Sequence, residues 1–320
     1  MTRYILIAAI VCAFSASAFA QSYPAKAVRL IVPFAPGGNV DITARAIGPG
    51  FAEALGQQVI IDNRGGAGGT IGADLVAKAA PDGYTLLMGS NSTVSVAPAL
   101  YPKNPYDPVR DFAPVSLVSE VPFVLVLHPS VPAKTAKELI ALARTKPGRM
   151  TMASAGTGSS NHLVGELFQS MTGVKLTHVP YKGSGPALVD LMGGQVDMHF
   201  DQLPSAIGYI KGGKIIALAM TTQKRAAELP QVPTLAESGV KGFDASGITG
   251  VLAPANTPRA VVDRLNAAVL KVLALPATKE RLAGFGATAI AGTPEAFAAF
   301  IREDFAKWSK VVKDANIKVE

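Results

Sequence analysis

Short apolar runs alternate with amphipathic segments along most of the chain. In the first third, apolar runs at 28–32, 59–61 and 85–88 predict strands, and the segments 40–55 and 70–80 between them have helical periodicity. This β-α-β-α-β order favours a parallel sheet covered by helices.

The same alternation starts again after a continuous apolar run at 121–128, which is itself a predicted strand. Beyond Pro129 the pattern predicts, in chain order, helix 134–144, strand 151–154, helix 161–172, strand 176–179, helix 186–193, strand 196–201, helix 205–211, strand 214–220 and strand 250–253. We therefore expect two successive parallel-sheet units, with a boundary near 121–129.

The last third predicts two long helices, 259–273 and 295–312. Each follows a Thr-Pro pair, Thr257-Pro258 or Thr293-Pro294. Threonine suits the N-cap position and proline the first helical position. Because two helices with little sheet of their own do not form a third domain, we expect them to pack onto one of the two sheet units.

These elements predict an α/β protein of two lobes with a cleft between them. Each lobe is expected to be a mostly parallel sheet flanked by helices. We expect residues 21–123 and 248–320 to form lobe I and residues 124–247 to form lobe II.

The first twenty residues have the pattern of a secretory signal peptide. Arg3 provides a basic start, residues 5–14 form an apolar run, and Ala18-Phe19-Ala20 is a small-residue cleavage site. The apolar run is shorter than the ~20 residues of a membrane-spanning helix. We therefore expect cleavage after Ala20 and export to the periplasm.

Charge and cysteine content exclude several classes of function. The net charge is +7, but the Lys and Arg residues are scattered without aromatic residues between them, which argues against nucleic-acid binding. Cys12, within the leader, is the only cysteine. The exported chain therefore has no disulfide, thiolate nucleophile or cysteine metal ligand, and we expect neither a cofactor nor a metal.

Two strand–glycine–helix junctions are the main candidates for ligand contact. Gly37-Gly38-Asn39 precedes the helix at 40–55, and residues 155–160 precede the helix at 161–172. Unpaired N–H groups and the helix dipole at such a terminus suit an anion. One junction on each lobe would grip a small anion across the cleft, at the carboxyl ends of the strands. The polar turn at 90–93 also follows a strand.

Nucleotide binding lacks its motifs. The glycines at 65–69 do not match a dinucleotide fingerprint, and no Walker sequence is present. Asp41, in the first helical turn, is better interpreted as an acid that satisfies nearby N–H groups than as a ligand contact.

Two enzyme or metal interpretations stay open as alternatives. Ser159 or Ser160 with His162 or His199 could serve a secreted serine hydrolase, although the closing glycine of a nucleophile elbow is missing. Asp197, His199 and Asp201 share one face of a predicted strand, as metal ligands could. The remaining histidines show no metal-ligand spacing.

Several motifs together resemble one family. They are Pro33-Phe34-Ala35-Pro36-Gly37-Gly38 with Asp41, Asn63-Arg64 with Gly66-Ala67-Gly68-Gly69, Pro81-Asp82-Gly83-Tyr84-Thr85-Leu86, Pro180-Tyr181-Lys182-Gly183, Phe200-Asp201 with Leu203-Pro204-Ser205, and Leu252-Ala253-Pro254-Ala255 with Thr257-Pro258. In this order they resemble the Bug family, the periplasmic solute-binding proteins of tripartite tricarboxylate transporters, over essentially the whole exported chain.

The resemblance implies a two-lobed periplasmic binding protein fold, type II-like, that closes on a small carboxylate without enzymatic activity. It also implies delivery to an inner-membrane permease of one large and one small subunit, and we expect a monomer. With the junctions above, it gives as candidate ligand-binding residues Phe34, Ala35, Gly37, Gly38, Asn39, Asp41, Ser90, Asn91, Ser92, Gly156, Thr157, Ser159, Ser160, His162, His199 and Asp201. Asp201 is included mainly because of the resemblance.

The chain departs from the family pattern at a few positions. Gly65 stands where the family usually has proline, His199 where it has an apolar residue, and Gln202 where it has asparagine. An aromatic residue that the family often carries within 246–250 is missing. Near the cleft, His199 and Gln202 are expected to alter which ligand fits. Gly65 is expected to loosen its turn, and the missing aromatic residue to enlarge the cleft or reshape the lobe junction.

Overall fold

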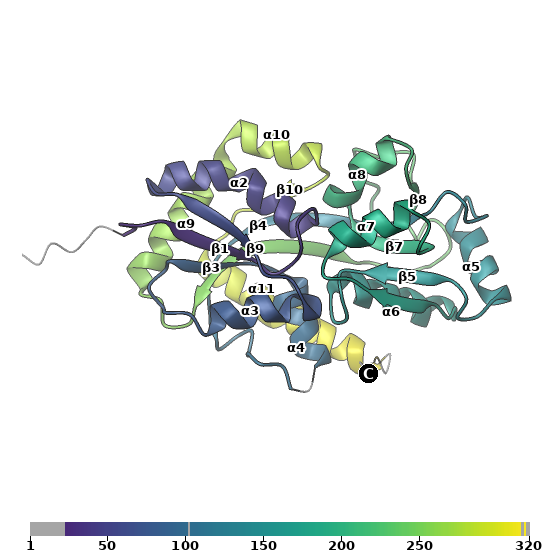
Figure 1. Ribbon diagram of the computed structural model, residues 1–320, viewed down its shortest axis with the longest axis horizontal. Coiled ribbons are helices and arrows are strands. Elements are labelled where there is room, and N and C mark those ends of the chain that lie inside the picture. The colour runs from purple at the N-terminus through teal and green to yellow at the C-terminus, as the bar shows by residue number, and fades with distance from the viewer. Residues whose placement is uncertain (1–22, 102, 315–316, 318–320) are drawn as a thin grey trace, which may run out of the picture.

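One long strand, β4 (Phe112–Leu127), runs through both halves of the molecule (Figure 1). The computed structural model describes residues 23–101, 103–314 and 317, so the expected signal peptide lies outside the described residues. Residues 112–122 of β4 pair antiparallel with β9 (Ser246–Pro254), and residues 123–127 pair antiparallel with β7 and β8. The proposed lobe boundaries, 123/124 and 247/248, fall within β4 and near the start of β9.

Each half of the sheet combines parallel and antiparallel pairs, and the two halves are lobes I and II in our proposed division. In lobe I the order is β2 (Val59–Asn63), β1 (Val28–Val32), β3 (Thr85–Ser90), β9 and β4. In lobe II it is β8 (Ile216–Met220), β4, β7 (Met198–Gln202), β5 (Thr151–Ser154) and β6 (Thr177–Pro180). The expected parallel pairing is found among the described strands only where β1 pairs with β2 and β3 and where β5 pairs with β6 and β7. The fold is therefore mixed α/β, with one sheet shared by both halves.

Helices cover both faces of each half (Figure 1). They are α2 (Asn39–Leu55), α3 (Thr70–Ala77), α4 (Ala97–Leu100), α5 (Ala136–Thr145), α6 (Ser160–Thr172), α7 (Ser184–Met192), α8 (Leu203–Lys211), α9 (Arg259–Ala274), α10 (Pro276–Gly284) and α11 (Pro294–Asp314). Short helical turns, Ala67–Gly69 and Ser92–Val96, lie beside the cleft, and β10 (Thr288–Ala289) pairs with β4.

The two C-terminal helices pack on lobe I, as expected. Buried residues of α9 join the core beneath α2, and Phe297 and Ile301 of α11 join the core on the opposite face of the sheet. Thr293 caps α11 by accepting a hydrogen bond from the N–H of Ala296. The predicted cap of α9 is wrong, because Thr257 donates to the carbonyl of Pro254 and Pro258 is the N-cap residue.

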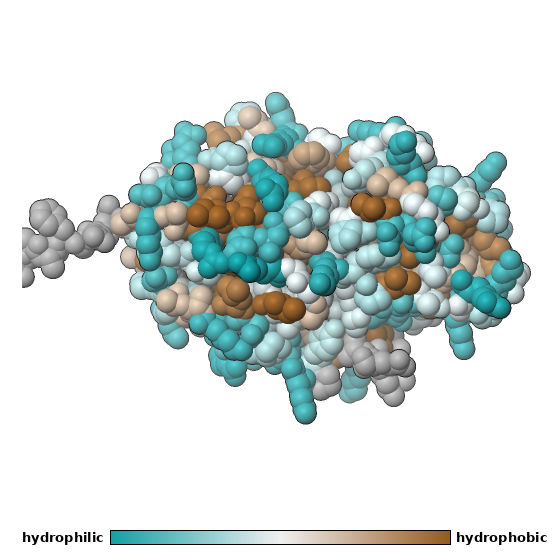
Figure 2. All heavy atoms as spheres, in the orientation of Figure 1, coloured by the Kyte–Doolittle hydropathy of each residue, from teal (hydrophilic) through white to brown (hydrophobic). Residues whose placement is uncertain are grey.

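The surface is mostly polar, as expected when most large apolar side chains are buried in internal cores. On the face shown in Figure 2, apolar positions lie in small separate patches among hydrophilic side chains. Among the helices of the described residues, none combines the length and the apolar character needed to cross a bilayer.

Candidate functional site

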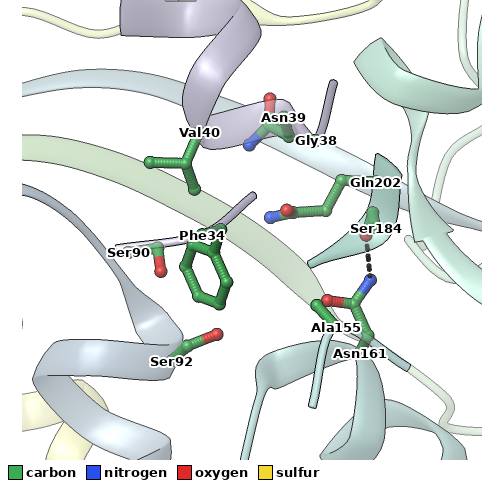
Figure 3. A pocket seen from close by; sticks show the side chains of 10 residues that line it. All are labelled: Phe34, Gly38, Asn39, Val40, Ser90, Ser92, Ala155, Asn161, Ser184 and Gln202. Carbon is green, nitrogen blue, oxygen red and sulfur yellow. Dashed lines mark hydrogen bonds between the residues drawn. The ribbon is translucent and has the colours of Figure 1, made fainter. Parts of the chain in front are cut away.

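A small cavity lies between the two lobes, at the carboxyl ends of β1, β3, β5 and β7 (Figure 3). Its volume is about 10 Å³, which in the closed structure leaves room for about one water molecule. Lobe I contributes Phe34, Gly38, Asn39, Val40, Ser90 and Ser92, and lobe II contributes Ala155, Asn161, Ser184 and Gln202. None of these ten side chains carries a charge, so any ligand here is held by neutral groups.

Direct hydrogen bonds join the two lobes around this cavity. The backbone N–H of Ser160 donates to the Ser92 hydroxyl at 2.8 Å, and the two serine hydroxyls are 3.0 Å apart. The Tyr101 hydroxyl donates to the carbonyl of Thr157 at 2.9 Å. The N–H of Ala35 donates to the carbonyl of Lys182 at 2.9 Å. The structure therefore has the cleft closed.

Three polar atoms that border the cavity are buried without a hydrogen-bond partner among the described residues. They are Asn39 Nδ2, Ser90 Oγ and Gln202 Nε2. Their residues are no more than 5% exposed. A buried polar group without a partner costs about 1–3 kcal/mol, so such groups are rarely left unused in a folded protein. An oxygen-rich ligand bound between the lobes, which need only separate slightly to admit it, would satisfy them.

The N-termini of α2 and α6 border the same cavity. α2 begins at Asn39 after Gly38, and no side chain caps it. α6 begins at Ser160, whose N–H is used by Ser92 across the cleft. The positive ends of these helix dipoles favour a negative charge between the lobes.

A buried His199–Asp201 pair lies next to the lining residues Ser184 and Asn161. His199 Nδ1 is 2.8 Å from the carbonyl oxygen of Ala153, which only accepts, so this nitrogen carries a proton. His199 Nε2 is 3.3 Å from Asp201 Oδ1 and 3.4 Å from Ser184 Oγ. The Ser205 hydroxyl also donates to Asp201 Oδ2 at 2.6 Å, so partners within lobe II hold the pair in place.

The expected site residues divide into three groups. Phe34, Gly38, Asn39, Ser90 and Ser92 line the cavity. Ala35, Gly156 and Thr157 line a wider, open groove at the mouth of the cleft, together with Tyr101 and Lys182. The other eight line neither the cavity nor the groove: they are Gly37, Asp41, Asn91, Ser159, Ser160, His162, His199 and Asp201.

Asp41 holds the shape of the first glycine junction. Its carboxylate accepts hydrogen bonds from the N–H of Gly37, from Arg45 and from Asn63, each at 3.0 Å. Burial alone would raise the pKa of Asp41, but these hydrogen bonds outweigh it and lower the pKa below its ordinary value. This placement is the interpretation that the sequence favoured for Asp41.

The remaining residues outside the lining have structural partners. Asn91 donates to Asp304 and accepts from the N–H of Ile248. Ser159 caps α6 by accepting from the N–H of His162. The His162 ring stacks on His178 with the ring centres 3.9 Å apart. These residues support the loops that border the cavity.

Five of the lining residues are not among the expected site residues. They are Val40, Ala155, Asn161, Ser184 and Gln202. Val40, Ala155 and Asn161 adjoin residues that were chosen. Ser184 follows Gly183 in a third strand–glycine–helix junction, between β6 and α7, which the same reasoning could have found. Gln202 was noted only as a departure from the family pattern.

Metal binding finds no support in the site. Within residues 23–101, 103–314 and 317, no group of three His, Cys, Asp or Glu side chains could hold an ion. Asp197, which the metal alternative used, accepts hydrogen bonds from the N–H and hydroxyl of Thr151.

His178 makes stability depend on pH. Burial, with the neighbouring His162 and His199, lowers the pKa of His178 from 6.5 to about 3. The unfolded chain therefore takes up this proton first, and stability falls as the pH drops from 7 towards 4. Because the ring is only half-buried, we expect a loss of about 1 kcal/mol between pH 7 and 5.

The change His178→Gln should flatten this dependence in urea unfolding at a series of pH values. It keeps a polar group beside Ser154, whose hydroxyl is 2.6 Å from His178 Nε2. His128→Gln, in a loop of the same lobe, is the control. Equal pH slopes for the wild type and His178→Gln would show that the assignment is wrong.

Comparison with known proteins identifies the family. Residues 43–317 match the model of the tripartite tricarboxylate transporter family receptor. Protein BugT of Bordetella pertussis is 40% identical over 324 residues, covering 100% of this chain and 99% of BugT.

Two solved structures share both fold and sequence. R. palustris Rpa4515 with adipate superposes with a TM-score of 0.90 at 38% identity, covering 92% of this chain and 99% of Rpa4515. MatC from Rhodopseudomonas palustris with bound malate gives a TM-score of 0.88 at 38% identity, covering 91% and 100%. The chain belongs to the receptor family of the tripartite tricarboxylate transporters.

Proposed function

We propose that this receptor binds a small carboxylate in the periplasm and delivers it to a membrane permease of one large and one small subunit. The cavity observation carries the proposal. A closed, uncharged space between two lobes contains unpartnered donors, among the described residues, from both lobes. Similar proteins hold adipate and malate. Cleft closure around the ligand would create the surface that the permease recognises, and we expect the receptor to act as a monomer.

The serine hydrolase alternative is not supported. The family is one of solute-binding receptors and is not enzymatic. Ser159 Oγ accepts from the N–H of His162, and Ser160 Oγ contacts Ser92 Oγ. Both serines therefore have structural partners instead of a general base.

A thermal-shift screen tests the proposal. The panel contains malate, C3–C6 dicarboxylates, the matching monocarboxylates and citrate, with the corresponding neutral amides as controls. At about one hundred times its Kd a ligand adds roughly 2.7 kcal/mol to stability, which corresponds to a shift of about 5 °C for a chain of this size. If carboxylates and amides give the same melting temperature throughout, the proposal is wrong.

A further inference from the structure

Gln202 brings a polar side chain from lobe II into the inter-lobe cavity. It ends β7 immediately before α8 and is 5% exposed. Its Nε2 atom has no hydrogen-bond partner among the described residues. In Figure 3 the amide group extends toward Phe34 and Asn39, which belong to the opposite lobe. The donor of lobe II thus faces the donors of lobe I.

The amide group of Gln202 occupies space that Gly247 leaves open. A Cβ atom at Gly247 would lie 2.1 Å from Gln202 Nε2 and 3.1 Å from Val121 Cγ2. The backbone of Gly247 does not have a left-handed φ, so conformation does not require glycine there. The missing side chain instead provides the space in which the amide group lies, on the strand β9 that lines the lobe junction.

We propose that Gln202, placed over Gly247, determines which carboxylates this receptor accepts. Its amide N–H donates to an oxygen of the bound ligand, and its length limits the carbon chain that the closed cavity admits. This inference rests on the proposed function, because it assigns the ligand selectivity of the same cavity. It predicts that residues 202 and 247 act as a coupled pair.

The substitution Gln202→Asn tests the limit on ligand length. It removes one methylene and withdraws the amide from the cavity. Binding of malonate, succinate, glutarate and adipate is measured by titration calorimetry for both proteins. We expect the preferred dicarboxylate to lengthen by one or two carbons, and affinity for the ligand that the wild type prefers to fall about tenfold or more through the lost hydrogen bond.

The substitution Gly247→Ala tests the coupling. The new methyl group would displace the amide of Gln202, so affinity should fall about tenfold or more. In the Gln202→Asn background the same change meets a shorter side chain and should have little effect. Gly284→Ala is the control, because a Cβ at Gly284 has no atom within 4 Å among the described residues. Melting temperatures of all variants show whether each is folded.

The outcomes separate this inference from the proposed function. If the wild type binds none of the dicarboxylates, this inference falls, and the proposed function falls with it only if malate, the monocarboxylates and citrate also leave the melting temperature unchanged. If the wild type binds but the order of preference is unchanged in Gln202→Asn, or the two substitutions have additive effects, the role of Gln202 is wrong and the proposed function stands. A shifted preference together with non-additive effects supports the inference.

Discussion

The substitution Gly185→Ala should prevent full closure of the cleft and weaken carboxylate binding by about a hundredfold or more. Gly185 lies in the first turn of α7, in lobe II. A Cβ atom there would lie 2.1 Å from the carbonyl oxygen of Pro36 and 3.5 Å from Gly37 Cα, in lobe I. Both contacts are with backbone, which cannot rotate away, so the lobes would have to separate by more than about 1 Å to reach ordinary contact.

Stability should change in the opposite direction from binding. Alanine is favoured over glycine within a helix by roughly 0.5–1 kcal/mol, and the clash exists only when the cleft is closed. We therefore expect an unchanged or slightly raised melting temperature. Calorimetry with malate and adipate measures the loss of affinity, and small-angle X-ray scattering measures the larger radius of gyration.

Gly208→Ala is the matched control for this experiment. Gly208 lies in α8 of the same lobe, and a Cβ atom there has no neighbour within 4 Å among the described residues. This variant should keep both the affinity and the scattering profile of the wild type. If Gly185→Ala does the same, α7 and the first glycine junction do not meet during closure, and the closing mechanism is wrong.

Most helices and strands were predicted from the sequence because each has its own local pattern of apolar residues. The first half of β4 has no such pattern and was missed. Pro114, Ser116 and Ser119 interrupt the apolar run there. The strand exists because it pairs with β9, where the hydroxyl groups of Ser119 and Thr249 lie 2.8 Å apart. The antiparallel direction of β4 and β9 also depends on distant segments. A local period therefore could not predict it.

In the candidate site too, the sequence predicted residues whose role depends on their near neighbours and missed a residue whose role depends on a distant segment. Helix-terminus reasoning led to Gly38, Asn39 and the 90–92 turn because each follows a strand directly in sequence. It did not lead to Gln202, because the space for that side chain depends on Gly247, which lies 45 positions further along the chain (247 − 202). Asn91 was selected with its neighbours, but contact with Asp304 and Ile248 turns it to a structural role.

The substitution Asn39→Asp should abolish carboxylate binding while the fold is kept. Asn39 is 2% exposed, and its Oδ1 accepts from the Thr43 hydroxyl at 3.3 Å. Its Nδ2, without a partner among the described residues, would become a carboxylate oxygen facing the ligand. The variant loses a hydrogen bond to a charged group and adds a like charge, so we expect a cost of about 3 kcal/mol or more, a hundredfold in Kd.

The start of α2 explains why this change should be tolerated. An acidic residue in the first turn interacts favourably with the helix dipole, and the open cleft exposes the new charge to water. Asn39→Ala removes the same donor without adding charge, so it should cost only about tenfold in Kd. Calorimetry with malate and adipate measures both variants. Equal losses for the two would mean that no ligand charge lies near position 39, and unchanged binding in both would remove Asn39 from the site. A larger loss for aspartate places the ligand carboxylate at the N-terminus of α2.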